Sequence, residues 1–344
     1  MRRRLQNRIA ESSATLPTVC VVATLLWWLP TGGYTTPLLL GWLACAVTTA
    51  FLLETDAQNA LLRVRSRMIP SLFLLLMAAC GFLHPLQDGT VVQLLLAASL
   101  LCLLRTSEHP RPQADTFHAH LLLSLSSLLW SPMLLLAPVL WWCQGVYLRS
   151  LGWRGLGAAV CGLVLPWAFW AGGAFALGQM QPFVDHAVDI IAPARVPFYW
   201  MWLIEQARQL TWADFWNTVP AELGSRLAAH VPEVATLAVT LLIGLTGFIH
   251  YVRRSYDDKI RVRMCHYTFM ALQFVMALWL VLQPQFFGQL MPLLLVTVAP
   301  AAAHFMALTR TWVTNAWVVF LALALLAAAV VALTPDAVLQ MAFK

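Results

Sequence analysis

Two aspartates stand four residues apart in the sequence PFVDHAVDII, at Asp185 and Asp189. On a helix this spacing places both carboxylates on one face. Like charges so placed mildly destabilise a helix, and either a bound cation or substrate or plain water would relieve the repulsion. A carboxylate in such a pair can act as the base that activates an acceptor group. We therefore predict Asp185 and Asp189 as catalytic residues if the chain is an enzyme, with a divalent cation as the cofactor that suits them.

Two arginines downstream of this pair have the chemistry to bind phosphate. Arg195 lies between two prolines in APARVP, which predicts a rigid, extended turn that presents its guanidinium. Arg208 follows in a stretch rich in Trp, Tyr and Phe, the residues that concentrate where a membrane meets water. The hypothesis is a lipid-phosphate site, with both arginines on phosphate and the carboxylates on a metal or hydroxyl. The alternative is a cover of short amphipathic helices that only seals the bundle.

Three further arginines, Arg63, Arg65 and Arg67, alternate along ETDAQNALLRVRSRM (54–68). They are predicted to bind a lipid headgroup. The alternative, which the composition favours, is an interfacial helix whose arginines extend into the headgroups. The segment 252–264 carries five cations, interpreted as orientation charges partly paired with Asp257 and Asp258.

The histidines and cysteines predict no metal site. His118 and His120 are two residues apart, so on a helix they point in different directions. HExxH, Gly-rich phosphate loops, a nucleophile elbow and CxxC pairs are all absent. His304 falls inside an expected membrane span, and a packed, hydrogen-bonded histidine is favoured over a functional one.

The composition is that of an integral membrane protein. The 344 residues are 60% hydrophobic and 10% charged, whereas soluble domains carry about 25% charged residues. Apolar runs recur along the whole chain, and the N-terminal run is interpreted as an uncleaved span. The sequence therefore predicts an all-α, polytopic helix bundle in which seven spans (1–178) precede an external amphipathic segment (179–232) and four spans (233–344). These eleven spans are 16–30, 36–53, 69–84, 91–104, 117–131, 133–148, 155–177, 233–251, 265–282, 288–308 and 312–333.

The basic residues orient this bundle. With the N-terminus inside, all but four of the 21 basic residues fall on the inner side; the exceptions are Arg195, Arg208, Arg226 and Lys344. Such a bias is the positive-inside pattern, and it predicts the N-terminus inside and the C-terminus outside. The net charge of +6 is thereby explained by topology and by contact with anionic lipids, and nucleic acid is excluded as a partner. The pair 117–131 and 133–148 is the weakest, with a re-entrant hairpin as its alternative.

Several runs resemble the C-type glycosyltransferase superfamily, polytopic enzymes that use polyprenyl-phosphate sugars. These runs are FHAHLLLSLSSLLWSPMLLLAPVLWWCQGVYLR, then SLGWRGLGAAVCGLVLPWAFW, and later QFFGQLMPLLLVTVAP, within 91–177 and 250–308. The resemblance implies a catalytic acid in the first external loop, but here that loop, LPTGGYTTP (29–37), has no carboxylate. The stretch NALLRVRSRMIPS is also similar to uncharacterised multi-pass proteins of Bacteroidetes.

The resemblance implies a protein of the bacterial plasma membrane that engages a polyprenyl-phosphate-linked substrate at the outer face in cell-envelope biogenesis, with or without catalysis. A non-enzymatic assembly subunit that binds a protein partner is the alternative. A lipid transporter is a third hypothesis, which the lack of Asp, Glu, Lys and Arg near the middle of the spans disfavours. Membrane lipids are the expected partners in every case.

Overall fold

The computed structural model describes residues 5–28, 35–64, 66–108, 111–191, 193, 205, 208, 214, 224, 230–309 and 311–334. Within these residues the chain is helical throughout and contains no strand. The helices are α1 (Leu5–Glu11), α2 (Thr15–Trp28), α3 (Thr36–Asn59), α4 (Met68–Ala79), α5 (Asp88–Arg105), α6 (Gln113–Ser127), α7 (Ala137–Trp142), α8 (Trp153–Ala176), α9 (Met180–Val188), α13 (Val231–Arg254), α14 (Ile260–Leu282), α15 (Phe287–Leu308) and α16 (Trp312–Leu333).

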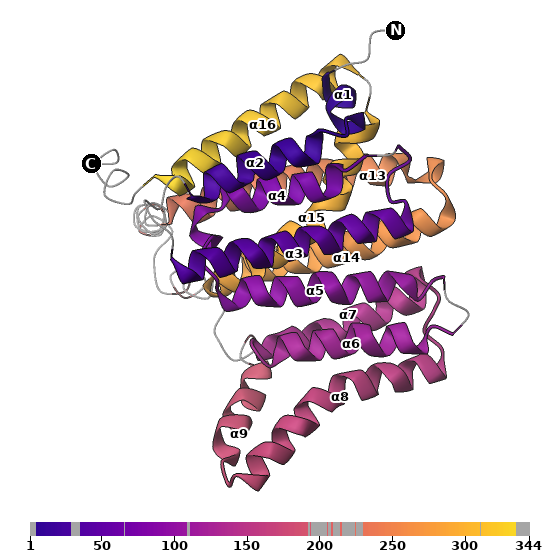
Figure 1. Cartoon of the computed structure of the whole chain (residues 1–344), viewed down its shortest axis with the longest axis vertical. Coiled ribbons are helices and arrows are strands. Elements are labelled where there is room, and N and C mark those ends of the chain that lie inside the picture. The colour runs from indigo at the N-terminus through magenta and orange to yellow at the C-terminus, as the bar shows by residue number, and fades with distance from the viewer. Residues whose placement is uncertain are drawn as a thin grey trace.

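Seven helices of the described part are long and apolar enough to cross a membrane: α3, α5, α8, α13, α14, α15 and α16. The expectation of an all-α, multi-pass membrane protein is confirmed in this coarse form. The helices lie nearly parallel and stack from α16 and α2 at the top of Figure 1 to α8 at the bottom. Within its apolar window α15 is 94% buried, against 17% for α16 and 22% for α8, so α15 is central and the other two are peripheral.

The remaining predicted spans are helical but short or broken. The helices α2 and α4 have 14 and 12 residues, and after α6 the chain forms a 3-10 turn, the short α7 and a π-helical turn (Cys143–Tyr147). Prolines at 132 and 138 lack the N–H that a regular helix needs, which accounts for the irregularity.

The broken segment nevertheless runs from one end of the bundle to the other. At one end Ser127 O bonds His186 Nε2 of α9, at 2.8 Å. At the other, the Ser150 hydroxyl lies 2.7 Å from that of Thr106, just after α5. The chain from Ser131 to Tyr147 therefore returns across the bundle rather than turning back halfway.

The main hydrophobic core joins helices from both sides of the 179–232 segment, with α15 packed against α4, α5, α13 and α14. Glycines permit the closest of these contacts, as small residues do at membrane helix interfaces. A Cβ built on Gly247 of α13 would lie 2.6 Å from Ala302 N, in the backbone of α15. By contrast, a Cβ on Gly157 of α8 would meet nothing within 4 Å.

Alanine substitution at these two glycines is expected to have opposite effects on thermal stability. Alanine is a better helix former than glycine by about 1 kcal/mol, so Gly157→Ala is expected to leave the thermal unfolding midpoint in detergent unchanged or raised. Gly247→Ala is expected to lower that midpoint by several degrees, because backbone of α15 occupies the space that the new methyl group needs. Equal midpoints for the two variants would show that α13 and α15 are not in such close contact.

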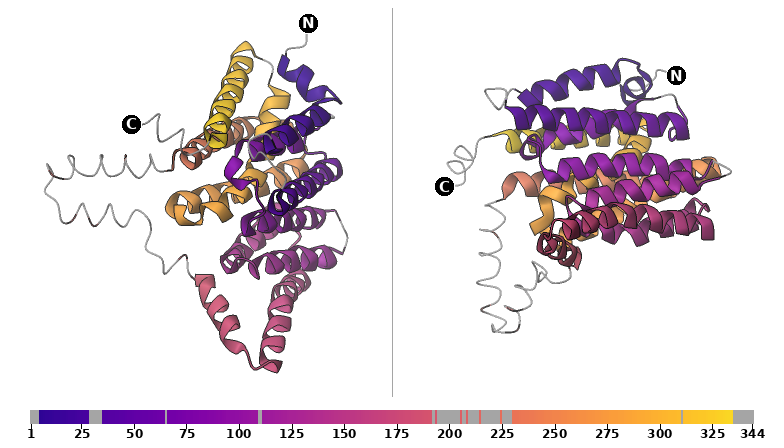
Figure 2. Two further views of the ribbon diagram at one scale, coloured as in Figure 1. Left: turned by 60° about the vertical axis from the view of Figure 1, so that its left-hand side comes forward. Right: turned by 60° about the horizontal axis from the view of Figure 1, so that its bottom comes forward.

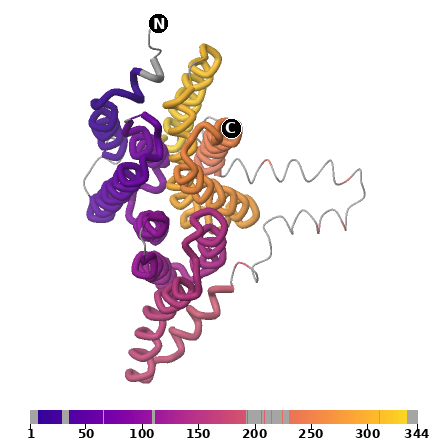
Figure 3. Tube along the Cα trace, turned by 90° about the vertical axis from the view of Figure 1, so that its right-hand side faces the viewer, coloured from indigo at the N-terminus to yellow at the C-terminus, as the bar shows by residue number. Residues whose placement is uncertain are grey.

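The connections that carry the arginines meet at one end of the bundle, which we call the basic end. Arg105 Nε donates to Gln58 Oε1 at 2.7 Å, and Arg261 Nη2 donates to Asn59 Oδ1 at 3.0 Å. Figure 3 looks onto this end, with the helices seen nearly end on. The α8–α9 pair extends from the bottom of the bundle, as the left view of Figure 2 shows. Polar side chains from several connections therefore contact one another at the basic end.

Candidate functional site

The two predicted catalytic aspartates lie on the surface at the opposite end from the basic connections. Asp185 is on the exposed face of α9 and accepts a hydrogen bond of 2.8 Å from Gln181 Nε2. Asp189 follows α9 and begins a short 3-10 turn, also exposed. No group of three or more His, Cys, Asp or Glu side chains in the described ranges has the geometry to hold a metal ion. The structure thus gives this pair no further ligand group.

The predicted arginines are only partly placed. Arg195 and Arg65 lie outside the described residues, and Arg208 is helical and exposed. Arg67 immediately precedes α4. Arg63 lines a pocket, and the described residues that line it with Arg63 include no other predicted site residue.

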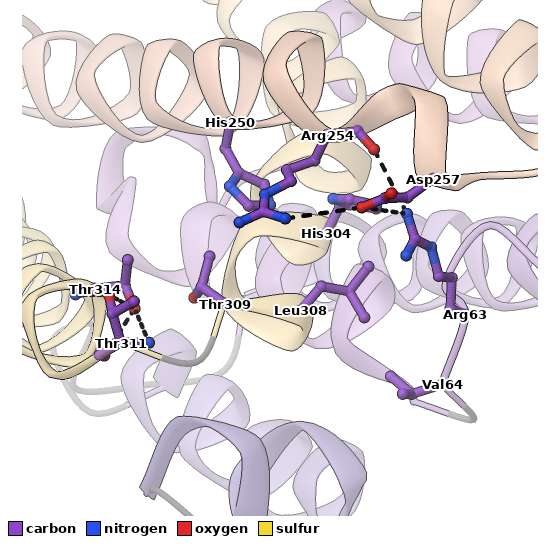
Figure 4. Close-up of a pocket in the computed structure, with 10 residues that line it drawn as sticks. All are labelled: Arg63, Val64, His250, Arg254, Asp257, His304, Leu308, Thr309, Thr311 and Thr314. Carbon is purple, nitrogen blue, oxygen red and sulfur yellow. Dashed lines mark hydrogen bonds and ion pairs between the residues drawn. The ribbon is translucent and has the colours of Figure 1, made fainter.

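The pocket has a volume of about 530 Å³ and lies at the basic end (Figure 4). Its walls come from the chain after α3, the last turns of α13 and α15, and the first turn of α16. The lining residues are Arg63, Val64, His250, Arg254, Asp257, His304, Leu308, Thr309, Thr311 and Thr314. Sequence segments separated by almost 200 residues therefore form one cavity where the helices end, with several charged and polar residues in its lining.

A buried carboxylate, Asp258, lies behind the pocket wall and contacts two of the residues that form it. Its side chain is 1% exposed, its Oδ1 accepts from Arg63 Nε, and its Oδ2 lies 3.2 Å from His304 Nε2. Burial by itself raises the pKa of Asp258, but the hydrogen bonds from His304 and Arg63 outweigh it and lower the pKa to about 2. Asp258 is therefore an anion that fixes both partners at the pocket wall.

Its neighbour Asp257 is held far less tightly. Its Oδ2 lies 3.7 Å from Arg63 Nη2 and 3.9 Å from Arg254 Nη1, and its side chain is 35% exposed. Both separations exceed a hydrogen bond, and half-exposed pairs of this kind contribute little. Figure 4 shows Asp257 between the two guanidinium groups. An incoming anion can therefore replace it at little cost.

Two imidazole nitrogens of the pocket have no hydrogen-bond partner within the described residues, His250 Nε2 and His304 Nδ1. Both atoms are buried, and the two ring centroids are 5.5 Å apart. Because His304 Nε2 donates to Asp258, its Nδ1 carries the lone pair in the neutral ring. Buried polar atoms are rarely left unsatisfied in native proteins, so these two nitrogens are exceptions within the described residues.

The first turn of α16 adds positive potential to the pocket. Thr311 and Thr314 form reciprocal caps, in which Thr314 N donates to Thr311 Oγ1 and Thr311 N donates to Thr314 Oγ1, each at 3.2 Å. A helix N-terminus carries a partial positive charge, and α16 is 22 residues long. Together with Arg63 and Arg254 it makes the pocket suited to an anion.

Sequence reasoning missed most of this site. The interpretation of His304 as a hydrogen-bonded, buried histidine is confirmed, but its partner was not foreseen, and the residue also lines a cavity. Asp257 and Asp258 were assigned to the cations of their own segment, whereas Asp258 bonds Arg63, 195 residues away. The sequence feature that could have indicated this site is the acidic pair inside the basic run RRSYDDKIRVR.

Comparison of the chain with protein-family models, curated proteins and solved structures finds no match.

Proposed function

We propose that this multi-pass membrane protein binds the phosphate-bearing headgroup of a lipid in the pocket at its basic end. The observation that carries the proposal is the cavity itself, which two guanidinium groups, Arg63 and Arg254, and two histidines line. Guanidinium and imidazolium groups are strong donors to phosphate oxygens. The threonine-capped N-terminus of α16 also favours binding of an anion.

The position of the pocket supports a lipid as the source of the phosphate. His250 and Arg254 lie in the last turns of α13, and Thr311 and Thr314 lie at the start of α16, both helices being candidate spans. The ends of membrane helices are at the depth of the headgroups. A lipid phosphate at this depth reaches the pocket without leaving the bilayer.

The topology belongs to the same proposal. Eleven crossings, with the basic end facing the cytoplasm of a bacterium, would place the pocket at the inner leaflet, where anionic lipids and basic residues attract each other. Reporter fusions after residue 60 and after residue 257 test the orientation. Activity of a periplasmic reporter at either position contradicts it.

The expectation of glycosyltransferase-like chemistry on a polyprenyl-phosphate-linked substrate at the outer face, through Asp185, Asp189, Arg195 and Arg208, stays a separate prediction. Its test is the double variant Asp185→Asn, Asp189→Asn. A full cell-envelope glycan phenotype at normal protein level would count against it.

Thermal unfolding of the purified protein in detergent tests the headgroup proposal. Dihexanoyl-phosphatidate is expected to raise the unfolding midpoint in a concentration-dependent way, because a ligand that binds only the folded state stabilises it. Dihexanoyl-phosphatidylcholine, whose phosphate is covered by a cationic group, is the matched control. A rise with inorganic phosphate equal to that with phosphatidate assigns the site to free phosphate, and no rise with either anion overturns the proposal.

A further inference from the structure

We infer that the lipid whose phosphate binds in the pocket places one unbranched acyl chain in a second, apolar cavity deeper in the bundle. This inference rests on the proposed function and adds the part of the lipid that enters the protein. The apolar cavity has a volume of about 60 Å³, and all of its lining residues, from α4, α13, α15 and α16, are apolar.

Two helices carry the pocket and the apolar cavity on the same face. On α13, Ile243 lines the apolar cavity, and His250 and Arg254 line the pocket seven and eleven residues later. Residues at this spacing share one face of a helix. On α16, Thr311 lines the pocket and Val318, again seven residues later, lines the apolar cavity. The two spaces therefore follow one another along both helices.

The order of the two spaces is that of the parts of a lipid. The pocket lies where α13 ends and α16 begins, so Ile243 and Val318 are further from these helix ends, toward the middle of the candidate spans. Seven residues of helix span about 10 Å. The headgroup layer on each side of a bilayer is only about 5–8 Å thick. The apolar cavity therefore lies at the depth of the acyl chains when a phosphate occupies the pocket.

The pocket and the apolar cavity are direct neighbours. Phe305 lines the apolar cavity, and its ring centroid is 5.3 Å from that of His250, which lines the pocket. Between the same two levels, Trp317 Nε1 of α16 donates to Thr246 Oγ1 of α13 at 3.3 Å. One lipid can therefore reach both spaces between α13 and α16.

The size of the apolar cavity and its position fit an alkyl chain. An apolar cavity of about 150 Å³ binds benzene, so a volume of about 60 Å³ admits a slender chain but not a ring. Ala322 lines the cavity and is exposed on α16, a peripheral helix, so the chain can enter sideways from the bilayer. A chain in the cavity supplies the dispersion contacts that the lining of a void lacks.

Photolabelling of the full-length protein locates the chain. The protein is reconstituted in nanodiscs of phosphatidylcholine with a phosphatidate that carries a diazirine in one acyl chain, and adducts are mapped by mass spectrometry. Adducts are expected at Met306 and Leu325, which line the apolar cavity, and excess unlabelled phosphatidate is expected to suppress them by about fivefold or more. Arg254→Gln is expected to suppress them too, because the chain enters with its headgroup in the pocket. Adducts at Leu323, which is exposed on α16 and does not line the cavity, are expected to persist.

The outcomes separate this inference from the proposed function. Cavity adducts that neither unlabelled phosphatidate nor Arg254→Gln reduces overturn the inference. It is also overturned if phosphatidate raises the unfolding midpoint but leaves no adduct in the cavity, which is the result expected if a protein segment covers the cavity instead. If phosphatidate does not raise the midpoint at all, the proposed function itself is refuted.

Two leucine variants on α16 test the same cavity by affinity. A leucine side chain in a helix extends over the residue about four positions before it, so Ala322→Leu covers Val318 at the cavity. This variant is expected to weaken binding of dioctanoyl-phosphatidate by about threefold or more in calorimetry. Ala327→Leu makes the same change at an exposed position that does not line the cavity, and its affinity is expected to stay within about 1.5-fold of wild type. Equal affinities of the two folded variants contradict the inference, and if Ala322→Leu does not fold, the photolabelling decides.

Discussion

The variant Asp258→Ala is expected to lose about 3 kcal/mol of unfolding free energy, the largest effect on stability that we predict. Removing one partner of a buried ionic cluster typically costs about 3–5 kcal/mol. The lower end applies because the Arg63 side chain is 39% exposed and stays hydrated, whereas His304 is buried and loses its acceptor. Thermal or denaturant-induced unfolding in detergent measures the loss.

The adjacent Asp257→Ala variant is the matched control. It removes the same side chain one residue away, but from long, half-exposed contacts, and is expected to cost less than about 1 kcal/mol. If both variants unfold alike, Asp258 does not tie the α13–α14 connection to Arg63 and α15.

The stability that Asp258 contributes has a defined pH range. Its pKa is lowered from 3.8 to about 2, so the folded state binds the proton less readily than the unfolded state. The contribution, about 2 kcal/mol at roughly 1.4 kcal/mol per pKa unit, is complete above pH 4 and is lost as the pH falls through about 2. The stability difference between wild type and Asp258→Ala is therefore expected to be constant above pH 5 and to shrink below pH 4.

Arg254→Gln is expected to weaken phosphatidate binding by about 10- to 100-fold, the largest effect on ligand binding that we predict from a change in charge. A hydrogen bond to a charged group contributes about 1.5–3 kcal/mol, and about 1.4 kcal/mol is tenfold in affinity. Arg254 lines the pocket and its side chain is 62% exposed, and its ion pair within the described residues is the long contact to Asp257. It can therefore turn toward a ligand at little cost.

Arg253→Gln provides a control with the same change of charge on the same turn of α13. Arg253 is exposed and does not line the pocket, so its replacement is expected to reduce affinity less than threefold, through the general field alone. Calorimetry with dihexanoyl-phosphatidate compares the two proteins. Equal loss in both would indicate diffuse attraction to a basic surface rather than a site.

The sequence by itself was sufficient for the seven long, apolar helices. The predicted span 312–333 coincides with α16, and 288–308 differs from α15 by one residue. An apolar run long enough to cross a bilayer satisfies its backbone only as a helix, so length and hydrophobicity determine it. Alternating crossings also predicted that the basic connections meet at one end, as the described helices do.

Only the tertiary structure decided which helix is central. In water, an amphipathic pattern marks the buried face, but in a membrane the faces toward lipid and toward protein are both apolar. The helices α15 and α16 therefore both have the composition of membrane spans, although one is buried and the other peripheral. Close approach at Gly247, which no periodicity marks, is one of the contacts that places α15 inside.

The candidate site was likewise beyond the sequence. Arg63, Asp258 and His304 lie in three segments, and none has a neighbour in the chain that predicts its partner. A carboxylate in a basic connection is expected to stay hydrated, since burying a charge is costly unless a partner compensates it. Here the packing of α13, α15 and the chain after α3 supplies two partners at once, and the same packing forms the cavity beside them. The sequence shows which residue types are present, but the packing of the helices determines which of these residues come into contact.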